Sequence, residues 1–122
     1  MITALIVEVG KPPAIAKIEP SLKTLCTLIG EAEAKQIDKN IYIIFNKDRF
    51  LSGFEANRKI NNDIICGTFY VIATDENGHL ISLTLKELEK YSKQFWFPQK
   101  FSYEETVQNY FDILEQEIFK NE

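Results

Sequence analysis

The sequence predicts one α+β domain with a mixed, mostly antiparallel sheet of about six strands, one short helix after the first hairpin and two C-terminal helices, in the order ββαββββαα. Runs of β-branched residues separated by turn residues fill the first two thirds of the chain, as in strands joined by hairpins. Apolar residues at helical spacing and capping signals dominate the last third. A length of 122 residues is that of one domain with a single core.

The N-terminal quarter predicts a hairpin and a helix. Residues 2–9 are nearly continuously apolar, as in a central strand covered on both faces. Residues 10–13 (GKPP) break that strand because proline cannot donate to a ladder, and residues 14–18 can return as its partner. The segment 19–21 (EPS) is typical of a helix start, and helical spacing then continues as far as Gly30.

The middle of the chain predicts a second hairpin and a long connection. Residues 31–38 are weakly patterned, but Lys39-Asn40 before the run 41–45 (IYIIF) indicates a turn into a buried strand. The stretch 46–62 is expected to be irregular but ordered, and a connection of this length is more often functional or disordered than neutral. Its polar and turn-forming residues are Asn46, Asp48, Arg49, Gly53, Asn57, Arg58, Asn61 and Asn62.

Residues 63–74 (DIICGTFYVIAT) form the strongest predicted strand. Gly67, near its middle, indicates a bulge or a close approach of another group to the backbone. The residues Glu76-Asn77-Gly78 predict a hairpin turn because Asn-Gly accepts positive φ at low cost, so residues 80–83 are expected to return as a strand.

Two helices are expected at the C-terminal end. Thr84 with Glu87 forms a capping-box pattern, and Ser102 with Glu105 repeats it. Residues 96–101 (WFPQKF) form an aromatic corner between the two helices. The apolar stripe of the last helix consists of Val107, Tyr110, Phe111, Leu114 and Ile118.

Composition and charge exclude several classes of protein. With 45% hydrophobic and 26% charged residues the chain is globular, and its net charge of -4 disfavours duplex nucleic acid as a partner. The opening segment has no basic lead, and no apolar run approaches the roughly 20 residues of a membrane span, so a cytoplasmic protein without membrane contact is expected. Cys26 and Cys66 lie in apolar runs without disulfide or metal spacing and are expected to be buried, reduced thiols.

The residues on which common enzymes depend are missing from the sequence. His79 is the only histidine and follows the Asn-Gly turn, so we expect a solvated turn residue and no zinc site. The glycines form neither of the two common phosphate-binding patterns. Only Glu8 and Asp63 are carboxylates in apolar surroundings, and both are expected at strand edges or turns. A non-enzymatic protein without metal or cofactor is therefore predicted.

One polar constellation predicts a ligand site. Arg58 offers a fixed fork of donors, Asn57 offers a donor and an acceptor, and Gly67 lets a ligand approach the backbone. Together they could hold a phosphate or a carboxylate, whereas the alternative is a loop salt bridge plus a β-bulge. The candidate ligand-binding residues are Asn46, Asn57, Arg58, Lys59, Gly67 and Thr68.

Two C-terminal surfaces each have two interpretations. The acidic side of the last helix is either a solvated face or a docking surface that imitates nucleic acid or engages a basic partner protein. The aromatic corner is either a lid on the core or an exposed anchor for self-association or a partner. The acids are Glu104, Glu105, Asp112, Glu115, Glu117 and Glu122, and the candidate interface residues are Trp96, Phe97 and Phe101.

Several segments together resemble a known family. They are ALIVEVGKPP, IEPSLKTLCTLI, IYIIFNKD, ANRKI, DIICGTFYVIATDENG and SLTLKELEKYSKQF. The chain is similar over these segments to the small phage-, plasmid- and conjugative-element-associated proteins known as domain of unknown function thirty-eight forty-six. The resemblance covers residues 1–101 as a family-like α+β core, and the acidic amphipathic helix at 102–122 extends beyond it.

The family pattern pairs Gly-x-x-x-Asn-Arg with a following Asp-Ile-Ile-x-Gly-Thr strand. Here the first part is Gly53, Asn57 and Arg58, and the second is the segment 63–68 (DIICGT). The resemblance implies that Asn57, Arg58 and Gly67 act together, either in the fold or in ligand binding. It carries over no established activity.

Three functions follow as hypotheses. The first is a non-enzymatic accessory binding protein of a phage or plasmid, which sequesters a small anionic ligand such as a signalling nucleotide and so counters a host defence. The second is a protein-interaction module that docks a host or element-encoded protein through the acidic final helix or the aromatic corner. An enzyme acting through Asn57, Arg58 and nearby acids is least favoured because no proton-transfer group is evident. The many aromatic residues leave homo-oligomerisation open.

Overall fold

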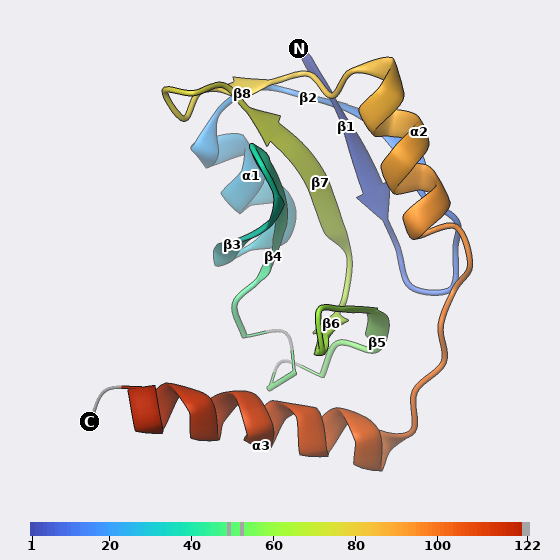
Figure 1. Ribbon diagram of the computed structural model, residues 1–122, viewed down its shortest axis with the longest axis vertical. Helices are drawn as coiled ribbons and strands as arrows, with labels where there is room; N and C mark the ends of the chain where they lie inside the picture. The colour runs from blue at the N-terminus through green and yellow to red at the C-terminus, as the bar shows by residue number, and fades with distance from the viewer. Residues whose placement is uncertain (49, 52, 121–122) are drawn as a thin grey trace.

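The main sheet has the strand order β2-β1-β7-β4-β3, with β8 paired to β7, and every pairing in it is antiparallel. The computed structural model describes residues 1–48, 50–51 and 53–120 (Figure 1). The expected α+β class, the six-stranded sheet and the two C-terminal helices are confirmed. The strands of the main sheet are β1 Ile2–Val7, β2 Ala14–Ile18, β3 Ala32–Asp38, β4 Ile41–Asn46, β7 Phe69–Thr74 and β8 Leu80–Ile81.

A second, two-stranded sheet lies between the main sheet and the last helix (Figure 1). It consists of β5 (Ala56–Ile60) and β6 (Asp63–Cys66). The stretch 46–62, expected to be irregular, therefore contains strand β5, and the expected long strand 63–74 is divided into β6 and β7. The division lies at Gly67, whose φ of 77° redirects the chain at low steric cost.

The three helices begin where their capping residues predict. The side chain of Ser21 caps the first helix, which ends at Gly30, and Thr84 with Glu87 forms a complete capping box on the second. Cys26 was expected to be buried, but it is exposed because the neighbouring Leu25 takes the inward position; Cys66 is buried as expected. The helices are α1 Leu22–Ile29, α2 Leu85–Gln94 and α3 Tyr103–Lys120.

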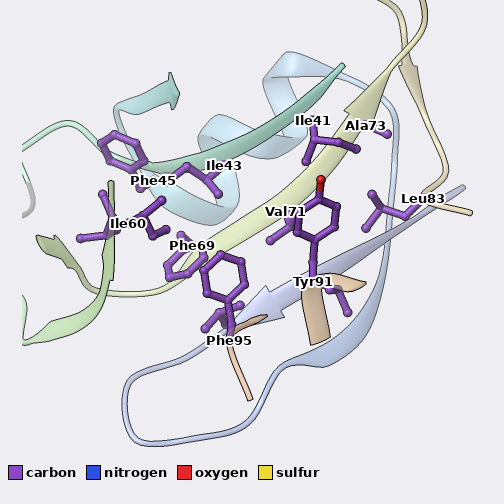
Figure 2. Packing of buried hydrophobic residues seen from close by; sticks show 13 residues of the cluster. Ile41, Ile43, Phe45, Ile60, Phe69, Val71, Ala73, Leu83, Tyr91 and Phe95 are labelled. Atoms are coloured by element: carbon purple, nitrogen blue, oxygen red, sulfur yellow. The ribbon is translucent and has the colours of Figure 1, made fainter. Parts of the chain in front are cut away.

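Alternation along the strands buries apolar side chains on both faces of the main sheet. On one face, Val71 of β7 belongs to a cluster with Tyr91 of α2, and Figure 2 shows their side chains together. On the other face, the next residue, Ile72, belongs to a cluster with Leu25 of α1. Helices α2 and α1 therefore cover opposite faces of the sheet, and α3 covers neither.

Asp38, at the end of β3, connects the β3–β4 turn to α2. Its Oδ2 accepts hydrogen bonds from Lys90 Nζ at 2.8 Å and from Tyr91 Oη at 3.0 Å, and its Oδ1 accepts from the Lys39 backbone N–H at 2.8 Å. The bond from Lys90, then those from Lys39 and Tyr91, lower the pKa of Asp38 from 3.8 to about 2. The carboxylate is thus held in its charged form.

This lowered pKa gives Asp38 a contribution to stability that depends on pH. A folded-state pKa below the unfolded value makes the contribution complete above about pH 4 and removes it as the pH falls towards about 2. We expect Asp38→Asn to reduce the pH dependence of the free energy of unfolding over that range. We expect Lys90→Gln to raise the pH at which Asp38 is half-protonated. Carboxyl-carbon NMR titration measures that midpoint, and an unchanged value in Lys90→Gln would contradict the assignment.

Helix α3 lies apart from the main sheet, across the small β5–β6 sheet (Figure 1). Among the residues of α3 that the structure describes, none is fully buried. The expected apolar stripe is present, but much of it faces solvent. Arg49, assigned from the sequence to the stretch 46–62, and Glu122, counted among the acids of the last helix, lie outside the described residues. The exposed large apolar residues of α3 are Tyr103, Phe111, Leu114, Ile118 and Phe119.

Candidate functional site

The side chain of Arg58 is completely buried, with 0% of its surface exposed. Its Nε donates to the Phe95 carbonyl at 3.1 Å, and its Nη2 donates to the same carbonyl at 2.8 Å and to the Lys11 carbonyl at 2.7 Å. Its Nη1 donates to Asn57 Oδ1 at 2.7 Å and to the Asn57 carbonyl at 3.4 Å. The five N–H donors of the guanidinium therefore all have acceptors within the protein.

The position of Phe95 explains how the charge of Arg58 is tolerated. Phe95 is the C-terminal capping residue of α2, where unpaired carbonyls carry the negative end of the helix dipole. The described acceptors of Arg58 are neutral oxygens, so its charge is met by carbonyl dipoles, and its burial lowers its pKa. Arg58 thus connects β5 to the end of α2 and to the β1–β2 turn.

Asn57 is also completely buried and completes the same network. Its Nδ2 donates to the carbonyl of Val7 at 2.9 Å and to that of Gly67 at 2.8 Å, while its Oδ1 accepts from Arg58. Asn57 therefore connects β5 to the end of β1 and to the residue between β6 and β7. Arg58 and Gly67 are linked through this amide.

Asn57 and Arg58 were expected to present their polar groups to a ligand, and the structure directs these groups to acceptors inside the protein. Their donors are used by backbone carbonyls, and their side chains have no exposed surface. The alternative role of Arg58, a salt bridge within the loop, does not match its described contacts either, because the oxygens that accept its hydrogen bonds are neutral. The pair holds the fold together.

Three other candidate residues, Asn46, Gly67 and Thr68, line one hollow of about 520 Å³. Asn46 is already engaged, because its Nδ2 donates to the Ile29 carbonyl and its Oδ1 accepts from the Asp48 N–H. The described lining includes Glu8 and Glu55 and no lysine or arginine, so its charge does not favour an anion. We call this space the Gly67 hollow.

Lys59 does not join these residues. Its side chain is exposed, and it lines neither the Gly67 hollow nor a second hollow beside α3, which is described below. Its backbone N–H donates to Gln99 Oε1 at 2.8 Å. Of the candidate ligand-binding residues, the structure therefore brings together Asn46, Gly67 and Thr68 in a hollow, places Asn57 and Arg58 in the core, and separates Lys59 from both.

A second hollow of about 600 Å³ lies between β3, β6 and α3. We call it the α3 groove. Its described lining combines apolar side chains from the loop after β4 and from α3 with charged side chains from β3 and β6. The apolar residues Phe50, Leu51, Tyr110, Ile113 and Leu114 belong to this lining, as do Lys35 and Asp63, whose side chains form an ion pair at 3.5 Å. Of these apolar residues, only Tyr110 and Leu114 belong to the helical stripe that the sequence predicts.

Two amide side chains hold the C-terminal segment to the small sheet, and one aromatic pair holds it to the loop after β4. Asn109 of α3 accepts from the Ile64 N–H at 3.0 Å and donates to the Asn62 carbonyl at 2.7 Å. Gln99 accepts from Lys59 on the other strand, as described above. The rings of Phe50 and Tyr110 stack with their centroids 4.9 Å apart. These bonds occupy both strands of the β5–β6 sheet and fix the place of α3.

The aromatic corner does not act as a complete lid on the core. Phe95, just before it, is buried, with its ring centroid 5.4 Å from that of Phe69. Trp96 is 48% exposed and Phe97 is 78% exposed, whereas Phe101 is partly buried. The corner therefore presents aromatic surface to solvent.

The described residues contain no group of three or more histidine, cysteine or acidic side chains placed to hold a metal ion. His79 is an exposed turn residue, as expected, and its Nδ1 lies 3.2 Å from Asp75 Oδ2. Asp63 begins β6 and Glu8 follows β1, which confirms the expected edge and turn positions. Over the described part of the chain, no helix is long and apolar enough to cross a membrane.

Comparison with known proteins gives one match. A family model described as "Domain of unknown function (DUF3846)" matches residues 2–96. No curated protein and no solved structure matches the chain. The matched segment includes the complete Asn57–Arg58 network and ends before α3.

Proposed function

We propose that this chain, which belongs to the DUF3846 family (domain of unknown function), is a non-enzymatic module that docks a partner protein through α3. The supporting observation is the apolar surface of this helix. Phe111 is 55% exposed and Ile118 is 59% exposed, although both belong to the apolar stripe of an 18-residue helix. Soluble proteins rarely leave such a stripe uncovered unless it is used for binding.

The exposed surface of α3 is continuous with the α3 groove. Leu114 belongs to the stripe and also lines the groove, and Leu51, which lines the groove from the opposite side, is 71% exposed. A partner side chain can therefore enter the groove while the rest of the partner covers the stripe. A hollow beside an exposed apolar strip is typical of the anchor pockets of protein interfaces.

The expected small anionic ligand has less support. Arg58, the cation on which that hypothesis depended, is buried and fully hydrogen-bonded, and the Gly67 hollow contains two carboxylates. The resemblance to phage, plasmid and conjugative-element proteins favours a host or element-encoded protein as the partner. We place that partner on α3 rather than in the Gly67 hollow.

Site-specific photo-crosslinking tests the docking surface. A photoreactive phenylalanine analogue replaces Phe111, or replaces exposed His79 on the β7–β8 turn as the matched control, in cells that express the chain. We expect an adduct from position 111 alone, which disappears when Leu114→Glu is added. The captured protein, once purified, should bind the original chain and not the Leu114→Glu variant. Equal adducts from both positions, or an adduct that survives Leu114→Glu, would refute the proposal.

A further inference from the structure

We infer that the partner of α3 is a basic amphipathic helix, an inference that rests on the proposed docking function. The shape of the apolar surface supports a helical partner. Val107, Phe111, Leu114 and Ile118, which we call the α3 stripe, are spaced by four, three and four residues and so lie along one face. The stripe extends over about 17 Å of the helix axis, and a second helix with the same spacing can pack along it.

The charges beside the stripe favour a basic partner. Glu104, Asp112 and Glu115 are exposed on the side of α3 next to Phe111. Their carboxylates would lie opposite the residues that flank the apolar face of a docked helix. Lysine or arginine at those flanking positions gives favourable pairs across the interface, whereas glutamate gives repulsion.

The same charges disfavour a second copy of the chain as the occupant. An antiparallel pair of α3 helices related by a two-fold axis would bring the acidic side of each helix next to its own counterpart. With a net charge of -4, two copies also repel each other at long range. A membrane surface is disfavoured as well, because helices that lie on anionic lipid carry lysine and arginine beside their apolar face.

Fluorescence anisotropy with two designed peptides tests this inference. Both peptides have the 18-residue length of α3 and apolar residues at the spacing of the stripe. One carries lysine and arginine at the remaining positions, and the other carries glutamate. We expect the whole chain to bind the basic peptide at least about tenfold more tightly, with affinity that falls as salt rises from about 0.05 M to about 0.5 M.

Charge reversal on α3 tests whether its acidic side chains determine which peptide is bound. The variant Asp112→Lys with Glu115→Lys should lose the basic peptide and gain the acidic one. The control variant, Glu76→Lys with Glu89→Lys, changes the net charge equally but away from α3, and should keep the original preference. Light scattering of the unmodified chain reports its oligomeric state alongside these measurements.

The outcomes separate this inference from the docking function. Equal binding of the two peptides, both lost in Leu114→Glu, would overturn the basic partner and leave α3 as the docking surface. Binding that is unaffected by Leu114→Glu would overturn both. A stable dimer that dissociates in Leu114→Glu would assign the stripe to a second copy and overturn the heterologous partner.

Discussion

Replacement of Arg58 by alanine is expected to lower the free energy of unfolding by about 3 kcal/mol or more, the largest loss among the substitutions considered. The change leaves the Lys11 and Phe95 carbonyls, and Asn57 Oδ1, without the donors that they have in the fold. Each unpaired buried acceptor costs about 1–3 kcal/mol. Urea denaturation followed by circular dichroism measures the loss.

Two further variants serve as controls for Arg58→Ala. Lys59→Ala, at the exposed neighbouring position, should change stability by less than about 0.5 kcal/mol. Arg58→Lys keeps the charge but not the planar fork, so we expect it to recover only part of the loss. If Arg58→Ala were as stable as the unmodified protein, the buried network would be unimportant and a ligand-binding role would return as the better explanation.

Replacement of Gly67 by alanine is expected to destabilise the protein by about 1–3 kcal/mol for two separable reasons. The φ of 77° is a left-handed conformation that alanine adopts only with strain. A Cβ at this position would also lie 3.1 Å from Cγ and 3.2 Å from Cβ of Phe54, which is closer than ordinary contact. Thermal or urea unfolding measures the sum of the two costs.

Gly78→Ala is the matched control for the conformational cost. Gly78 has a φ of 83°, and a Cβ added there would meet nothing within 4 Å. The difference between the two alanine variants therefore reports the contact with Phe54. In a Phe54→Ala background, the loss of unfolding free energy caused by Gly67→Ala should fall towards that caused by Gly78→Ala. An unchanged loss would show that contact with Phe54 does not contribute to it.

Hairpin pairings and helix starts could be predicted because they depend on residues close together in the sequence, whereas the pairings of β7 with β1 and with β4 join distant segments. Asn77-Gly78 specifies a tight turn wherever the flanking residues alternate, and the capping box of Thr84 and Glu87 is closed by residues three positions apart. Gly67 was correctly marked as a special backbone position. Its effect, which is to end one strand and begin another in a different sheet, depends on packing that the local sequence does not contain.

Strand β5 could not be predicted, because two of its three buried positions, Asn57 and Arg58, are polar. Asn57 and Arg58 are compatible with the interior only where carbonyls meet their donors. For Arg58 those carbonyls belong to Lys11 and Phe95, which are 47 and 37 residues away from it in the sequence. Asn57, Arg58 and Gly67 are nevertheless in direct contact, since the Asn57 amide links the two other residues.

The sequence predicts helix α3 but does not show which of its sides is covered by the rest of the protein. A stripe of apolar residues at helical spacing is the same whether the helix covers its own core or binds another molecule. Only the arrangement in space shows that Asn109 holds α3 on the small sheet and that Tyr110 stacks on Phe50, while Phe111 and Ile118 face outward.

The Asn57–Arg58 network closes within the segment 2–96, whereas the stripe and the acids proposed for docking lie after residue 102. Under the docking function that we propose, substitutions on the outer side of α3 change which molecule is recognised at little cost in folding free energy. An engineered replacement of the outward side chains of α3 should then redirect this chain while it keeps its architecture.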